Sequence, residues 1–251
     1  MKITFAIPKH TLLIAALGLM MSAYAQLVAQ AQTFQINTLP YTVTVPGIYT
    51  LERNFTSTAR VLITITSPDV TLDLGSHILT STNPSTVACI IVKAFNGFGT
   101  GNVTIRNGTI RNQNQANSVT VSDGLPTDGI GVLIEGGGGN DLLQNVSIST
   151  SGSSAIVDTG GGNIIRNCII SAGHGGQPAI FLRAIDLVTA NIIYPNESNI
   201  AVQTGHTVHA EDAIFGNVIY LSHPSPPGFN PVNHSGSQIP NTLDTVFRNP
   251  G

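Results

Sequence analysis

The stretch NIIRNCII, residues 163–170, places Asn167 inside a mostly apolar run. An Asn recurs in the same setting along the chain, in VTIRNGTI (Asn107), DLLQNVSI (Asn145), NIIRNCII (Asn167), LVTANIIY (Asn191) and AIFGNVIY (Asn217). The last four of these Asn residues are 22, 24 and 26 residues apart. A period of this length indicates a repeat architecture in which each repeat is one structural unit.

A second short apolar strand precedes each of the later copies, and these strands are GVLIE (131–135), SAIVD (154–158), PAIFL (178–182) and NIAVQ (199–203). No segment after residue 25 shows a sustained 3.6-residue apolar pattern, so the repeat is built from strands. We therefore expect a β-solenoid whose coils stack about 4.8 Å apart. Asn suits the sharp turn because it tolerates left-handed backbone angles and its amide can bond to the Asn above and below.

Stacking of the coils predicts columns of equivalent residues. Counting from each Asn, we expect two inward columns, Ile105, Leu143, Ile165, Thr189 and Phe215, and Ile110, Ile148, Ile170, Tyr194 and Tyr220. The outward column is expected to be Thr109, Ser147, Ile169, Ile193 and Ile219. An exposed apolar stripe of Ile169, Ile193 and Ile219 would need a cover, either the C-terminal tail or a partner chain in a homo-oligomer.

This pattern resembles the right-handed parallel β-helix proteins of the pectin-lyase-like superfamily, whose second turn often carries such an Asn ladder. The resemblance covers about residues 40–221. It implies an all-β fold, a single-stranded right-handed parallel β-helix over residues 26–221 with an N-terminal β cap, followed by an irregular Pro/Asn-rich tail over residues 222–251. It does not decide the chemistry, because lyases, hydrolases, epimerases and non-catalytic proteins share the fold.

The first 25 residues have the pattern of a signal peptide. Lys2 and Lys9 form a basic region, an apolar run follows, and Ala23-Tyr24-Ala25 is an A-x-A cleavage site. We therefore expect a secreted or periplasmic protein cleaved after Ala25, with no membrane attachment afterwards, since the apolar run is too short to span a bilayer comfortably.

The charge of the chain limits the classes of partner that it can bind. Loss of the leader would change the formal net charge from −3 to −5 and leave Lys93 as the only lysine, which argues against nucleic acid as a partner.

Cys89 and Cys168 fall several coils apart, on the order of 15 Å, whereas a disulfide needs Cα atoms within about 7 Å. We expect two separate buried thiols.

One candidate site resembles that of the polygalacturonases of this fold. Asp128 in PTDGI and His174 in the Gly-His-Gly of residues 173–175 match parts of that arrangement. Ser153 and Ser154 stand where the resemblance implies a pair of aspartates. Glycoside hydrolysis needs two carboxylates, so the simpler interpretation is that these residues belong to turns of a scaffold.

A second candidate site resembles that of the pectate lyases. Aligned by their ends, GVLIE and SAIVD stack Glu135 on Asp158, and Arg183 lies near the next position. Two carboxylates one coil apart could hold Ca²⁺, and the resemblance implies that Arg183 acts as the base. The alternative is a solvated row of charges at the edge of the sheet.

A third cluster is HTVHAED, which contains His206, His209, Glu211 and Asp212. Imidazoles and carboxylates this close together could bind Zn²⁺ or a similar ion, although no closed four-ligand spacing is evident.

The sequence thus predicts a secreted β-helix protein that presents a parallel-sheet face to an extracellular polymer, a polysaccharide, with little or no catalysis. The alternatives are a Ca²⁺-dependent polyuronate lyase and a structural or adhesive module that assembles through the Ile169, Ile193 and Ile219 stripe. Trp is absent and most aromatic residues fall at expected core, cap or leader positions, so no aromatic platform for sugar stacking is expected.

Overall fold

The computed structural model describes residues 32–94, 101–114, 128–136, 139–172, 177–183, 186–196, 200–205 and 213–221, and the backbone of residues 232–234 and 245–248. The chain divides into two units, Met1–Gln32 and Thr33–Gly251, and all the described strands lie in the second. The predicted signal peptide lies outside the described residues. No helix in the described part is long and apolar enough to cross a membrane.

The described residues form 22 β-strands in two sheets and no helix. Sheet A contains β1 (Thr33–Ile36), β3 (Gly47–Leu51), β4 (Phe55–Ser57), β6 (Val70–Asp73), β7 (Ile78–Ser81), β9 (Thr104–Asn112), β11 (Leu142–Thr150), β13 (Ile164–Arg166), β14 (Ile169–Ser171), β16 (Leu187–Thr189), β17 (Ile192–Tyr194), β19 (Ala213–Phe215), β20 (Val218–Leu221) and β22 (Thr245–Arg248). Sheet B contains β2 (Tyr41–Val43), β5 (Val61–Ile65), β8 (Ala88–Val92), β10 (Ile130–Ile134), β12 (Ile156–Asp158), β15 (Ile180–Leu182), β18 (Val202–Thr204) and β21 (Val232–His234).

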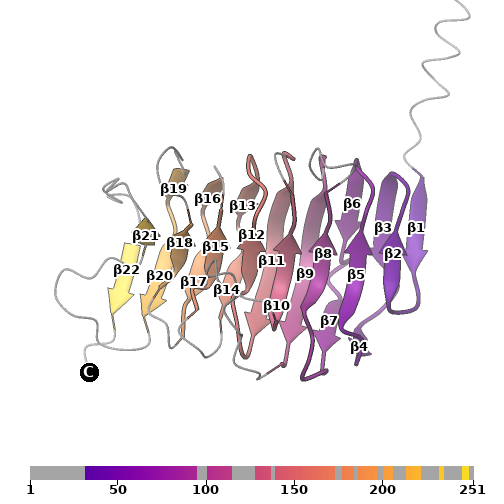
Figure 1. Ribbon diagram of the computed structural model, residues 1–251, viewed down its shortest axis with the longest axis horizontal. Coiled ribbons are helices and arrows are strands. Elements are labelled where there is room, and N and C mark those ends of the chain that lie inside the picture. The colour runs from indigo at the N-terminus through magenta and orange to yellow at the C-terminus, as the bar shows by residue number, and fades with distance from the viewer. Residues whose placement is uncertain are drawn as a thin grey trace, which may run out of the picture. The chain divides into compact units, whose positions relative to one another are not determined.

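Successive turns of the chain add one strand to sheet B and then return to sheet A. All strand pairs are parallel, and each strand pairs with the equivalent strand of the next coil, such as β10 with β12 and β12 with β15. Figure 1 shows the strands side by side in chain order, from indigo β1 to yellow β22. The predicted fold class, an all-β single-stranded parallel β-helix, is confirmed.

Sheet A bends within each coil, which gives it a first limb before the bend and a second limb after it. Strands β9 and β11 run through the bend, whereas later coils divide there into β13 and β14, β16 and β17, and β19 and β20. In the five coils from β9 to β20, one residue takes a left-handed conformation at the bend, and these residues are Asn107 (φ 59°), Asn145 (φ 55°), Asn167 (φ 53°), Ala190 (φ 55°) and Gly216 (φ 68°). The expected role of Asn in the turn is therefore confirmed for the first three coils only.

In the last two coils the left-handed residue comes one position earlier than predicted. Ala190 and Gly216 make the bend, and the Asn residues that follow them, Asn191 and Asn217, are buried. Side chains alternate between the two faces of a strand, so a shift of one residue exchanges inside for outside. Every face assigned by counting from these two Asn residues is therefore reversed.

The inward columns correct the prediction accordingly. On the first limb Ile165 pairs in register with Val188, and Val188 with Ile214, so Thr189 and Phe215 face outward. On the second limb the inward column is Ile110, Ile148, Ile170, Ile193 and Ile219, all at most 1% exposed. Full burial of such side chains stabilises the fold by about 1.5–3 kcal/mol each.

The predicted outer stripe is wrong at two of its three members. Ile169 is outward and 48% exposed, but Ile193 and Ile219 are fully buried in the core. Their places in the outward column are taken by Ile192 and Val218, which pair with each other in register and are half-buried.

Paired strands lie at both ends of the stack. The expected N-terminal cap consists of regular coils, since β1 pairs with β3 and β2 with β5. Aromatic rings close this end of the core, where Phe34 stacks on Tyr49 with ring centroids 4.6 Å apart. At the other end, β21 pairs with β18 and β22 with β20, so both sheets extend into the segment expected to be an irregular tail.

The two cysteines are free and buried, as predicted. Burial raises the pKa of the Cys89 thiol to about 12 and that of the Cys168 thiol to about 11, in each case mainly because the charged thiolate loses its hydration. Both thiols are therefore neutral packing groups of the core.

Candidate functional site

The predicted carboxylate pair on sheet B is not formed. Asp158 is wholly buried and pairs in register with Ile134 on one side and Leu182 on the other, and both of these residues belong to the core. Its carboxylate oxygens accept hydrogen bonds from the Gly160 amide and from the Asn163 side chain, each at 2.8 Å. The Asp158 carboxylate is therefore a buried hydrogen-bond acceptor inside the β-helix and does not face a ligand.

Glu135 follows directly after β10, one position beyond Ile134, the register partner of Asp158, and it is half-buried. Its amide bonds to the Val92 carbonyl, and the Thr159 and Arg183 amides bond in the same way to residues of the coil before. Glu135, Thr159 and Arg183 therefore share a column, with Arg183 two coils from Glu135, about 10 Å away. The predicted stacking of Glu135 on Asp158 is wrong by one residue, and a role for Arg183 as a base stays a prediction.

The outward face of sheet B is largely covered. Its outward column contains Ile91, Leu133, Val157 and Phe181, and three of these side chains are at most 5% exposed. They form a second apolar cluster distinct from the main core. This face therefore offers little apolar surface to a ligand.

The region of the predicted hydrolase site is also part of the interior. Asp128 is half-buried, while Ser153 and Ser154 are buried and their hydroxyls have no hydrogen-bond partner. Ser153 packs close to the backbone of Gly129, where a Cβ atom would approach the Ser153 Cβ to 3.2 Å. Ser153 and Ser154, which stand where the resemblance implies aspartates, supply no carboxylate to this region.

The histidine predictions lie outside the described residues, namely His174, His206 and His209, together with Glu211 and Asp212. Within the described part, no group of three or more His, Cys, Asp or Glu side chains is arranged to hold a metal ion. The Zn²⁺ and Ca²⁺ interpretations stay predictions.

The outer surface of the second limb of sheet A carries two outward columns, and sequence analysis had placed only Ile169 of their members correctly on this face. We call one of them the polar row, which consists of Arg111, Ser149, Ser171, Tyr194 and Tyr220. The other is the apolar row, which consists of Ile169, Ile192 and Val218. Both rows flank the inward isoleucines of the same strands, so alternation along each strand turns them outward.

Two tyrosines end the polar row. Tyr194 and Tyr220 are 37% and 39% exposed, and their rings stack with centroids 5.0 Å apart and an interplanar angle of 10°. Next to them in the row, the Ser171 hydroxyl accepts a hydrogen bond from the Asn196 side chain at 3.3 Å. The assignment of both tyrosines to the inward column was therefore wrong.

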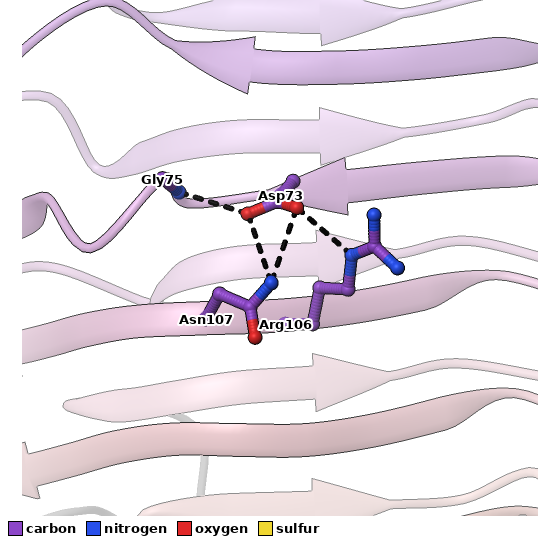
Figure 2. A network of polar contacts seen from close by, with 4 residues as sticks. All are labelled: Asp73, Gly75, Arg106 and Asn107. Carbon is purple, nitrogen blue, oxygen red and sulfur yellow. Dashed lines mark hydrogen bonds and ion pairs between the residues drawn. The ribbon is translucent and has the colours of Figure 1, made fainter.

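The first limb of sheet A carries a column of longer polar side chains on its outer face. Arg106 Nε donates to Asp73 at 2.9 Å, and the same carboxylate accepts from the Asn107 side chain and the Gly75 amide (Figure 2). Further along the column, Arg166 donates twice to Gln144 Oε1, at 3.2 and 2.9 Å. Each of the two arginine contacts joins outward side chains that stand in register on neighbouring coils.

A signal for the correct faces was present in the sequence. In each of the five coils from β9 to β20 the two inward aliphatic residues stand five positions apart, as in Ile105 and Ile110, Ile165 and Ile170, or Val188 and Ile193. The Asn drifts relative to this pair, so alignment on the aliphatic pair identifies both outward rows and alignment on the Asn does not.

Comparison with protein-family models, with curated protein sequences and with solved structures finds no match to this chain.

Proposed function

We propose that this chain is an exported β-helix protein of the pectin-lyase-like kind that binds an extended extracellular polysaccharide along the second limb of sheet A, with little or no catalysis. The polar row carries the proposal. It offers a hydrogen-bonding group on each of five consecutive coils: one guanidinium, two serine hydroxyls and two phenols. The strands that carry these groups are about 4.8 Å apart.

A polysaccharide fits this surface because it repeats and because each unit has two kinds of surface. Its hydroxyl groups can exchange hydrogen bonds with the polar row. Its apolar C–H surfaces can pack on the neighbouring apolar row, where Ile169 is 48% exposed and Ile192 and Val218 are half-buried. A surface built from parallel strands is rigid, so little conformational entropy is lost from the protein on binding.

The composition of this face favours binding over hydrolysis. From β9 to β20, none of the described outward residues of sheet A is Asp or Glu. Acid–base cleavage of a glycosidic bond uses two carboxylates, and this surface supplies neither.

The proposal is tested by affinity electrophoresis of the purified protein in gels that contain polygalacturonate, alginate or neutral glycans. Arg111→Ala and Tyr220→Ala should each weaken retention by about fivefold to tenfold, the loss expected for a well-placed interface contact. Arg60→Ala is the matched control, because Arg60 is also exposed but lies at the start of the sheet B strand β5.

Retention by no polysaccharide would overturn the proposal. Retention that survives both sheet A substitutions but is lost in Arg183→Ala would move the binding face to sheet B. The same mixtures, followed with and without Ca²⁺ for unsaturated products, test the catalytic part, and a Ca²⁺-dependent product would contradict little or no catalysis.

A further inference from the structure

Tyr194 and Tyr220 form a pair whose geometry suggests covalent chemistry. They lie on adjacent strands, because Ile193 pairs in register with Ile219 and each tyrosine follows its isoleucine. Both rings are more than one-third exposed and stack almost in parallel, with centroids 5.0 Å apart. The paired strands thus keep two phenols side by side at the surface.

The other described tyrosine pair lacks these properties. Tyr41 and Tyr49 have ring centroids 6.1 Å apart at an interplanar angle of 61°, and Tyr49 is only 2% exposed. The Tyr49 hydroxyl also donates to the Val45 carbonyl at 3.0 Å. This pair therefore serves as a comparison within the same molecule.

We propose that Tyr194 and Tyr220 are an oxidative cross-linking site at which a peroxidase and hydrogen peroxide join the two rings. Each phenol loses one electron and one proton to give a phenoxyl radical. The two radicals form one carbon–carbon bond between ring positions ortho to the oxygens, and loss of the two ortho hydrogens as protons to the ring oxygens restores both phenols. Two tyrosines and one hydrogen peroxide thus give one dityrosine and two waters.

The stack favours this reaction within one chain over reaction between chains. Because the backbone pairing of β17 with β20 holds one ring beside the other, the second ring is present at a high effective concentration. The product would be a covalent cross-link between two successive coils of sheet A, near the C-terminal end of the sheet. The two cysteines do not supply such a cross-link, since both are buried and free. This inference does not depend on polysaccharide binding.

The test treats dilute full-length protein with horseradish-type peroxidase and hydrogen peroxide and follows dityrosine fluorescence. We expect a monomer lighter by two hydrogen atoms, a proteolytic fragment that joins Tyr194 to Tyr220, and a higher Tm. Tyr194→Phe and Tyr220→Phe should each reduce the monomeric cross-link to background. Tyr41→Phe should leave it unchanged.

Phe keeps the aromatic ring and removes only the hydroxyl, so thermal unfolding of the untreated variants should match the parent protein and exclude misfolding. Dityrosine found only in dimers would overturn the proposal, as would no dityrosine at all. A monomeric cross-link that persists in Tyr194→Phe would do so too.

Discussion

The coil that contains Asn145 and the coil that contains Asn191 bend in different ways. In the first, Asn145 itself is left-handed and exposed, and β11 runs through the bend without interruption. In the second, Ala190 is left-handed and Asn191 points into the core between β16 and β17. Asn145 comes two residues after the inward Leu143, whereas Asn191 comes three residues after the inward Val188, so one Asn faces outward and the other inward.

The buried Asn residues replace backbone bonds where the strands are interrupted. Asn191 Oδ1 accepts from the Cys168 amide at 2.9 Å, and its Nδ2 donates to the Ile165 carbonyl at 3.0 Å. Asn217 bonds in the same way to the Asn191 amide and the Val188 carbonyl. The predicted contact between stacked Asn side chains is made here, between Asn191 and Asn217 at 3.0 Å. The comparison shows that one residue type meets two separate needs, a left-handed turn and the satisfaction of buried backbone groups.

The largest effect should distinguish the two roles directly. Asn191→Ala leaves the Cys168 amide and the Ile165 carbonyl buried without their side-chain partner, so we expect a loss of about 2–4 kcal/mol in the free energy of unfolding. Asn145→Ala places Ala in a left-handed position and should cost about 1–2 kcal/mol. Urea denaturation of both variants measures the difference. Equal losses would mean that the buried Asn ladder contributes nothing of its own.

On sheet B, a buried carboxylate, Asp158, can be compared with an outward one, Glu135. Asp158→Ala removes a buried acceptor of two hydrogen bonds and should cost about 2–3 kcal/mol. Glu135→Ala, at a half-buried outward position, should change stability by less than about 0.5 kcal/mol. Chemical denaturation of the two variants checks the ordering, and a larger loss in Glu135→Ala would contradict the register described above.

Cys168 occupies the same interior position as Asn191, one coil earlier. The ionisation of its thiol should make the free energy of unfolding depend on pH in the alkaline range. Burial raises its pKa to about 11, above the unfolded value near 9, so the unfolded chain releases the proton first. The contribution to stability is therefore complete below pH 9 and falls as pH rises towards 11, by about 1 kcal/mol at pH 10.

The thiol prediction is checked by unfolding curves from pH 8 to 10 for the parent protein and for Cys168→Ala. The variant should show a shallower decline, with Cys89 and Tyr49, whose pKa values burial also raises, contributing to the remainder. An unchanged slope would mean that the Cys168 thiol does not control this dependence.

The smallest effect concerns the left-handed residue itself. Ala190 has a φ of 55°, a conformation that Gly adopts without strain, so Ala190→Gly should stabilise the protein by about 0.5–1 kcal/mol. Asn167→Gly, at the equivalent position one coil earlier, should change little because Asn tolerates this conformation. Thermal unfolding of both variants gives the comparison, and destabilisation by Ala190→Gly would place the bend elsewhere.

Much of the fold was predictable from local pattern. The repeated strands, the parallel stack, the separate buried thiols and the left-handed Asn107, Asn145 and Asn167 all follow from residues close together in the sequence. The candidate sites were less predictable. Glu135 and Asp158 were aligned by the ends of their segments, but register depends on backbone bonds to the neighbouring coil, such as that from the Thr159 amide to the Ile134 carbonyl.

The sequence by itself determined that the chain forms stacked coils, because it repeats short strands with no helical pattern and, in the five coils from β9 to β20, an aliphatic pair five residues apart. Only the tertiary structure decided which residue makes each bend and, with it, which side chains face outward. Tyr194 and Tyr220 reach the surface because Ala190 and Gly216, and not the following Asn residues, take the left-handed conformation. The physical reason is that faces alternate with every residue, so bonds between coils more than 20 residues apart in sequence decide a choice that neighbouring residues leave open.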